Sequence, residues 1–426
     1  MLRELAFFLA SVACSSAFLT SPGALNSRQS INSLCANDRV ACFSSVKSVF
    51  RASKIAVNNI QMTHGGKHLS AAQKAELVKT AKAMCQSGKG LTATDEGPGT
   101  VGDRFEKVGI INTEENRRLY RQMLYAVPNG PKYLSGAILD PETVYQKNDA
   151  GVLFPEMLSN LGIVPGVKPH LKVYQLPGCP PGETVMQGLD SLAARCKEYY
   201  KAGIRFAKWR SPLVITNGGM SDLAIRTNMD DLARYALICQ AEGLMPIVEP
   251  DISMAGDHDL ETAVEINVRV QSHLYKSMID HGVYMEGTTL KPNMVMPGKL
   301  CPKPYTVEEI AEANVVVLRR VFPCAMLGAN YLSGGQSLED GAARLSAINQ
   351  AKGNSPWNLS FSWSQALQLP LLELCKKNAP GSPLPIAEMS ALLQKELEIA
   401  GAAARGEHRW KAGEGDHKPK VLVGAK

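Results

Sequence analysis

The feature that most constrains this chain is an eightfold alternation of short apolar runs with longer amphipathic stretches, starting near residue 70. The runs span residues 90–95, 133–139, 162–168, 204–210, 244–250, 284–292, 324–334 and 358–364. Between them, Ser70-x-x-Gln73 and Thr306-x-x-Glu309 are capping boxes, and residues 183–201 carry one apolar stripe at helical spacing. Eight strand and helix units favour a closed parallel (β/α)8 TIM barrel, as a single domain, over an open doubly wound sheet.

Charged residues gather where these runs end. In a barrel of this kind the chemistry sits at the carboxyl ends of the strands. The residues found there are Asp95, Lys168, Lys208 with Arg210, Glu249 with Asp251, Lys291, Ser333 with Gly334 and Gly335, and Ser362 with Gln365. A buried charge costs several kcal/mol unless it is paired, so structure alone gives little reason to place three lysines there. For any single lysine, a purely structural ion pair stays open.

This set of residues suits a phosphorylated carbonyl substrate. A lysine amine attacks a ketone when its pKa falls far enough to leave it neutral, and a second cation nearby lowers that pKa. Lys208 and Lys291 are expected to face each other across the barrel and to act in this way. Glu249 and Asp95 are available to move protons, or to serve only as ion-pair partners of the lysines.

The glycine-rich turn LSGGQS, at residues 332–337, contains the signature sequence of ABC-type ATPases. Such an ATPase also needs a glycine loop ending in Gly-Lys-Ser/Thr, and the nearest stretch, Gly298-Lys299-Leu300, lacks both the upstream glycine and the hydroxyl. The backbone amides of Ser333 to Gly335 are instead expected to hold a phosphate at the end of the seventh strand. A simple turn remains the alternative.

Several long stretches resemble the class I fructose-1,6-bisphosphate aldolase family, from about residue 70 to 404. They are GLTATDEG around Asp95, NTEENRRLYRQ at 112–122, FAKWR around Lys208, PIVEPDI around Glu249, EGTTLKPNM around Lys291, and the LSGGQS turn. The resemblance implies reversible cleavage of fructose 1,6-bisphosphate to dihydroxyacetone phosphate and glyceraldehyde 3-phosphate. It also implies a homotetramer that needs neither a cofactor nor a metal, acting in glycolysis, gluconeogenesis or the Calvin cycle.

The same resemblance implies individual roles. Lys291 matches the Schiff-base lysine, Glu249 the principal acid and base, Asp95 the carboxylate near the cleaved bond, and Lys208 the lysine that assists the carbinolamine steps. Residues that match phosphate-binding positions are Arg104, Lys168, Arg210 and Ser333 to Gly335.

Some positions depart from the family pattern. Gln365 stands where an arginine usually binds the ketone-side phosphate, and glutamine hydrogen-bonds a phosphate without neutralising it. The chain ends VLVGAK, without the terminal tyrosine that assists protonation in many animal enzymes. Two alternatives therefore stay open: a Schiff-base aldolase that prefers sedoheptulose bisphosphate or a sugar monophosphate, and a catalytically weakened scaffold that binds other proteins or membranes.

The amino-terminal sequence indicates targeting. Residues 1–18 resemble a secretory signal peptide, and residues 19–60 are Ser/Asn-rich with five basic residues and only Asp38 acidic, as in transit peptides. Together they predict import into the plastid of an alga whose plastid has an extra membrane. The expected barrel then covers 61–404, and a flexible tail covers 405–426.

Composition restricts the partners. Of the net charge of +6, the first 60 residues contribute +4, so the rest offers no broad basic surface for nucleic acid. No apolar run after the first segment approaches 18 residues, so we expect no stable membrane association. Ten dispersed cysteines without CxxC spacing predict free thiols, and eight scattered histidines give no metal cluster.

Overall fold

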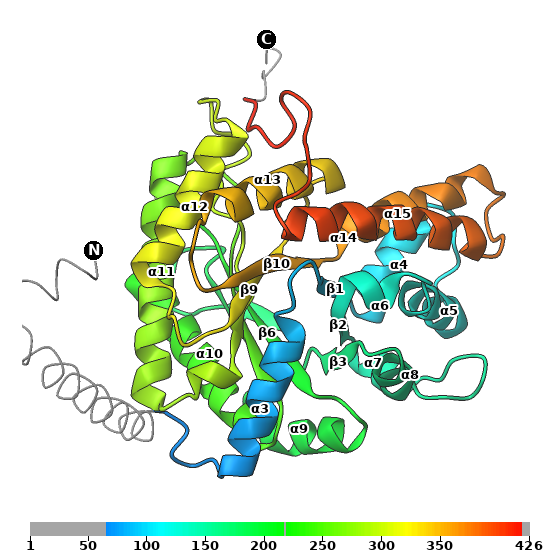
Figure 1. Ribbon diagram of the computed structural model, residues 1–426, viewed down its shortest axis with the longest axis horizontal. Coiled ribbons are helices and arrows are strands. Elements are labelled where there is room, and N and C mark those ends of the chain that lie inside the picture. Colours follow the sequence, from blue (N-terminus) through cyan, green and yellow to red (C-terminus); the bar gives the residue numbers. More distant parts are fainter. Residues whose placement is uncertain (1–64, 217–218, 420–426) are drawn as a thin grey trace, which may run out of the picture. The chain divides into compact units, whose positions relative to one another are not determined.

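The computed structural model describes residues 65–216 and 219–419, and its fold is the predicted (β/α)8 barrel (Figure 1). The two predicted targeting segments lie outside the described residues. Around the closed parallel barrel the strands follow in the order β1 (Gly90–Thr94), β2 (Leu134–Leu139), β3 (Val164–Val167), β6 (Phe206–Leu213), β7 (Met245–Ile252), β8 (Thr289–Leu290), β9 (Gly328–Leu332) and β10 (Asn358–Trp363), with β10 pairing back to β1. Six of them lie within their apolar runs, and β6 and β7 begin within theirs and extend beyond residues 210 and 250.

Helices follow the strands and cover the outside of the barrel. They are α3 (Ala71–Met84), α4 (Pro98–Glu106), α5 (Glu114–Tyr125), α6 (Gly130–Tyr133), α7 (Pro141–Val144), α8 (Phe154–Asn160), α9 (Leu192–Lys201), α10 (Asp222–Ala241), α11 (Leu260–His281), α12 (Val307–Val321), α13 (Leu338–Ala351), α14 (Gln365–Glu373) and α15 (Ile386–Ala404), with 3-10 turns η1 (Met285–Gly287) and η2 (Leu374–Lys377). Both predicted capping boxes are confirmed at the starts of α3 and α12. Figure 1 shows α10, α11 and α12 packed side by side, and α15 against α5 and α6.

The prediction of one helix over residues 183–201 is wrong in its first half. Residues 184–186 form β5 (Thr184–Met186), which pairs antiparallel with β4 (Val173–Gln175) outside the barrel. The helix α9 begins only at Leu192. Gly188, at φ 120°, and Ser191, at φ 58°, both have backbone conformations that an α-helix does not allow, so the apolar spacing before them belongs to a strand and a turn.

The barrel interior is divided into an apolar layer and a polar layer. One buried cluster joins Leu91, Ala93, Ile138, Phe206, Met245 and Ile247 to Leu77, Ala81 and Met84 of α3, so that this helix packs against the apolar interior. Two residues beyond Ala93, Phe206 and Ile247 come Asp95, Lys208 and Glu249. Side chains two apart on a strand point the same way, so these charged groups follow the apolar layer inside the barrel.

The chain after α15 is bonded to the barrel, which differs from the flexible tail expected after residue 404. The buried Arg344 of α13 donates from Nε to the carbonyl of Gly415 (2.7 Å) and from Nη2 to that of Asp416 (3.0 Å). His417 forms a backbone bridge with Tyr305. A buried guanidinium needs acceptors, and the carbonyls of this segment supply them. Residues 420–426 lie outside the described part.

Two further observations bear on the expectations from composition. All seven cysteines of the described residues are free thiols, as predicted for them. Within residues 65–216 and 219–419, no helix combines the length and apolar character that crossing a membrane requires.

Gly166 of β3 gives a direct test of the packing inside the barrel. A Cβ on this residue would lie 2.2 Å from the Phe206 ring, which is fully buried. We expect Gly166→Ala to lower the free energy of unfolding by about 1–3 kcal/mol, because the interior has no room to adjust. Gly99→Ala in α4 is the matched control, since a Cβ there meets nothing within 4 Å. Denaturant titration of both variants measures the difference, and equal stabilities would contradict this packing.

Candidate active site

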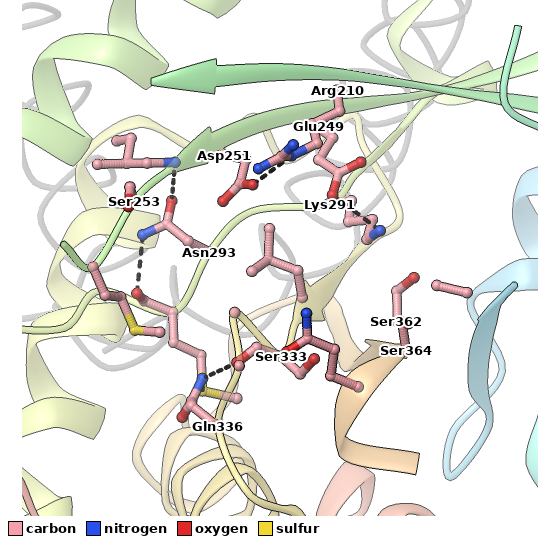
Figure 2. A pocket seen from close by; sticks show the side chains of 18 of the residues that line it. Arg210, Glu249, Asp251, Ser253, Lys291, Asn293, Ser333, Gln336, Ser362 and Ser364 are labelled. Carbon is pink, nitrogen blue, oxygen red and sulfur yellow. Dashed lines mark hydrogen bonds and ion pairs between the residues drawn. The ribbon is translucent and has the colours of Figure 1, made fainter. Parts of the chain in front are cut away.

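A cavity of about 420 Å³ opens at the carboxyl ends of the barrel strands. Five cationic and four carboxylate side chains line it: Arg104, Lys208, Arg210, Lys291 and Lys299, with Asp95, Glu96, Glu249 and Asp251. Figure 2 shows Arg210 and Glu249 projecting from neighbouring strands, with Lys291 beside Glu249. The strand-end residues singled out in the sequence therefore do meet in one place, with Lys168 as the exception described below.

Glu249 is the centre of the charged group. Its Oε1 lies 3.0 Å from Lys291 Nζ and its Oε2 lies 3.0 Å from Lys208 Nζ. Lys208 Nζ also lies 2.7 Å from Asp95 Oδ2. The Lys208, Glu249 and Lys291 residues are only 3%, 3% and 4% exposed, so these are buried ion pairs that water screens little.

Burial and charge oppose each other in the pKa values of this group. Burial by itself raises the pKa of Asp95, but Lys208 and then Lys291 and Lys168 outweigh it and hold that pKa far below its usual range. Burial likewise raises the pKa of Glu249, and Lys208 and Lys291 outweigh it, so the net shift is downward. Both carboxyls are therefore ionised at neutral pH.

The expected mutual effect of the two lysines is not found for Lys208. Burial lowers its pKa, but Asp95 and Glu249 outweigh burial and raise the pKa above its ordinary value. The lysines also do not face each other directly, since Glu249 of β7 lies between β6 and β8 and bonds to both. Lys208 is thus held as a fixed cation.

Lys168 is engaged by other groups than those of the cavity lining. Its Nζ donates to the backbone carbonyl of Asp95 (2.5 Å) and lies 3.0 Å from Asp140 Oδ2. It is absent from the residues that line the cavity. Asp140 comes directly after Leu139, the last residue of the apolar run 133–139, so the residues at the run ends do not include it. Reading one residue further along β2 finds it.

The two arginines of the cavity are each paired with a carboxylate. Arg104 of α4 lies 2.9 Å from Glu96 Oε1 and hydrogen-bonds Ser364 and Gln368. Arg210 Nε lies 2.6 Å from Asp251 Oδ2. Glu96, directly after Asp95, was not singled out in the sequence. A carboxylate that neutralises an arginine makes that arginine less available to a phosphate.

The glycine turn after β9 has the properties of an anion cradle. Gly334 and Gly335 have φ of 58° and 81°, which favours glycine. Within the described residues, the N–H groups of Gly334 and Gly335 donate to no protein acceptor. Gln336 supports the turn, since its Nε2 donates to the Ser333 carbonyl (2.8 Å) and its Oε1 accepts from Arg344 (2.5 Å). The turn lies on the cavity, as the sequence predicted.

Ser362 and Gln365 complete the wall beside this turn. Ser362 is the penultimate residue of β10, and its buried hydroxyl has no hydrogen-bond partner in the described part of the chain. Gln365 is the first residue of α14. The amino end of a helix beside a cavity favours an anion, because its first N–H groups have no partner within the helix.

The described residues that line this cavity do not form a metal-binding group. Across residues 65–216 and 219–419, no group of three His, Cys, Asp or Glu side chains is arranged to hold a metal ion. The carboxylates of the cavity are occupied by lysines and arginines instead.

The fold and site together define a barrel enzyme whose cavity is lined by buried lysines and carboxylates and by a glycine turn. Comparison with known proteins identifies the family within this class of enzymes. The sequence profile of the class I fructose-bisphosphate aldolases matches residues 76–423. The chain belongs to this family, and it is a lyase of that class.

This chain can be aligned with named relatives over nearly the whole length of each relative. The chain is 46% identical to the fructose-bisphosphate aldolase of Echinococcus multilocularis over 341 residues, which is 80% of this chain and 93% of the relative. It is 45% identical to human fructose-bisphosphate aldolase C over 348 residues, 82% and 94% of the two chains. A solved Plasmodium falciparum fructose-bisphosphate aldolase, in complex with TRAP and a small molecule inhibitor, has a TM-score of 0.77 and 41% identity and covers 82% of this chain and 99% of its own.

The depressed pKa values predict how stability changes with pH. Asp95 and Glu249 titrate near 3.8 and 4.5 in an unfolded chain and lower in the folded one. Their stabilisation is therefore present above those values and is lost as the pH falls toward the folded values. We expect the melting temperature to fall less steeply between about pH 5 and pH 3 in Asp95→Asn than in wild type. Parallel curves in calorimetry would contradict the buried network.

Proposed function

We propose that Lys291 is the Schiff-base lysine of this aldolase and that Glu249 is its acid and base. The observation that carries this proposal is the 3.0 Å contact between Lys291 Nζ and Glu249 Oε1 inside the barrel. Glu249 accepts the proton of the Lys291 ammonium, which leaves a neutral amine for attack on the substrate ketone. The carboxyl then returns that proton to the carbinolamine oxygen, which leaves as water.

Carbon–carbon cleavage follows from the same geometry. The iminium formed on Lys291 accepts the electron pair of the breaking bond while Glu249 or Asp95 removes the proton of the substrate hydroxyl. The aldehyde phosphate leaves first. Protonation of the enamine and hydrolysis of the iminium then release the ketone phosphate and restore the amine. Each step is reversible.

Lys208 serves as a permanent cation in this scheme. Asp95 and Glu249 raise its pKa, so it does not compete with Lys291 as a nucleophile. It lies within 3.0 Å of both carboxylates and stabilises them whenever Lys291 is neutral. We propose this as its contribution to the carbinolamine steps.

The substrate phosphates are assigned to opposite sides of the cavity. The turn from Ser333 to Gly335, with Ser362 and Gln365, is proposed to hold the phosphate on the ketone side. Arg104, Arg210 and Lys168 are proposed for the other phosphate. Arg104 and Arg210 line the cavity. Lys168 acts indirectly, because its Nζ donates to the backbone carbonyl of Asp95 and so fixes that residue.

Removal of the Lys291 amine tests the proposal. We expect Lys291→Met to lose at least about 10⁴-fold in the rate of fructose 1,6-bisphosphate cleavage, because no covalent intermediate forms. Lys276→Met is the control, since Lys276 lies on the surface of α11, where its ammonium pairs with Asp280. Retained cleavage in Lys291→Met would overturn the role. Parallel assays with sedoheptulose bisphosphate and fructose 1-phosphate rank the alternative substrates, and cleavage of none by the wild type would favour the scaffold hypothesis.

We further propose a homotetramer located in a plastid. The resemblance to the family supports the tetramer, and the composition of residues 1–60 supports the location. Light scattering of the purified chain distinguishes a tetramer from smaller assemblies. In the plastid, the condensation direction would serve carbon fixation.

The leader can be tested separately from catalysis. We expect residues 1–60 fused to a fluorescent protein to reach the plastid of an alga with a complex plastid, because a signal segment and a basic transit segment follow in series. A fusion of residues 19–60 is the control and is expected to stay outside the plastid, since the signal segment is missing. Cytosolic fluorescence of the full leader would contradict the location.

A further inference from the structure

Lys299 differs from the other cations of the active-site cavity. The others are paired with carboxylates: Arg104 with Glu96, Arg210 with Asp251, and Lys208 and Lys291 with Glu249. Lys299 also lines the cavity, yet it forms no ion pair with any residue in the ranges that the structure describes. Its positive charge is therefore not neutralised by the protein there.

The amine of Lys299 lies beside the glycine turn. A Cβ placed on Gly335 would be 3.6 Å from Lys299 Nζ and 3.4 Å from Gln365 Oε1. The ammonium and the neutral amide thus lie on the same side of this residue. The turn itself presents the N–H groups of Gly334 and Gly335, which have no acceptor among the described residues.

The backbone holds Lys299 in this position. Three successive N–H groups donate to the segment after β7, from Gly298 to the His258 carbonyl (2.8 Å), from Lys299 to that of Met254 (2.8 Å) and from Leu300 to that of Gly256 (2.9 Å). A Cβ on Gly298 would lie only 2.4 Å from the Gly256 carbonyl oxygen, so the two segments approach as closely as glycine permits. These contacts fix the backbone that carries the Lys299 side chain.

The chemistry of the turn leaves a role for this charge. Backbone N–H groups and the Gln365 amide donate hydrogen bonds to a phosphate but do not neutralise it. A phosphate in a cavity partly shielded from water is stabilised by a cation at hydrogen-bond distance. We propose that Lys299 supplies this positive charge and sets the affinity for the ketone-side phosphate. This proposal rests on the proposed function, which assigns that phosphate to the turn.

The condensation reaction separates the two phosphates, because dihydroxyacetone phosphate carries only the ketone-side one and glyceraldehyde 3-phosphate only the other. We expect Lys299→Met to raise KM for dihydroxyacetone phosphate at least about tenfold. The KM for glyceraldehyde 3-phosphate should stay within about twofold, and kcat should change little, because the contact is the same in the ground state and the transition state.

Two further variants complete the test. Lys303→Met is the matched control, since it removes the same charge four residues away, where the amine pairs with Glu261. Gln365→Arg added to Lys299→Met should restore most of the affinity, because it puts a cation on the same side of Gly335. Lys299→Gln serves the same purpose as Lys299→Met if the latter folds poorly.

The outcomes distinguish this inference from the function itself. An unchanged KM for dihydroxyacetone phosphate in an active Lys299→Met enzyme overturns the inference and leaves the aldolase assignment intact. An equal rise in both KM values also overturns it, since general attraction of anions would then explain the effect. Cleavage that survives in Lys291→Met instead overturns the proposed mechanism, whatever Lys299 does.

Discussion

The site depends on one carboxylate shared by two lysines. Glu249 lies 3.0 Å from the Nζ of both Lys208 and Lys291 inside an apolar barrel. Removing either partner would leave a buried charge uncompensated, which costs several kcal/mol. The arrangement also gives the two amines different tasks. Lys208 has a second carboxylate partner, Asp95, which helps to keep it charged, whereas among the described residues the ion-pair partner of Lys291 is Glu249, the proposed acceptor of its proton.

The barrel makes this arrangement possible through its alternating side chains. An apolar layer from β1, β6 and β7 packs against α3, and the next inward-facing positions on the same strands carry Asp95, Lys208 and Glu249. Rigid strands thereby fix the distances on which proton transfer depends, and parallel pairing of β6 with β7 sets Lys208 and Glu249 side by side. The glycine turn follows β9 instead, so the proposed phosphate binding and the proposed covalent chemistry depend on different elements.

The sequence predicted the fold well and the site in part. Eight apolar runs with intervening helical stretches sufficed for the barrel, because strand and helix periodicity are local properties. The apolar spacing over residues 183–201 predicted the start of α9 wrongly. The backbone angles at Gly188 and Ser191 decide where that helix starts. Their position at strand ends was enough to predict that one cavity contains Asp95, Lys208, Glu249 and Lys291.

The sequence could not show which charged side chains form ion pairs with each other. Lys168 turns toward Asp140, Glu96 neutralises Arg104, and Lys299 reaches the glycine turn from a segment that is remote in sequence. These contacts depend on side-chain direction and on approaches between loops, neither of which has a local pattern. The same limit explains why proximity to Lys291 suggested a lowered pKa for Lys208, whereas Asp95 and Glu249 raise that pKa.

The central claim is that a covalent bond forms between the sugar ketone and the amine at the end of β8. Borohydride reduction in the presence of dihydroxyacetone phosphate, followed by peptide mapping, tests it most directly. We expect one stable adduct per chain, on Lys291. An adduct on Lys208 or on any other lysine, or turnover without a trappable adduct, would contradict it.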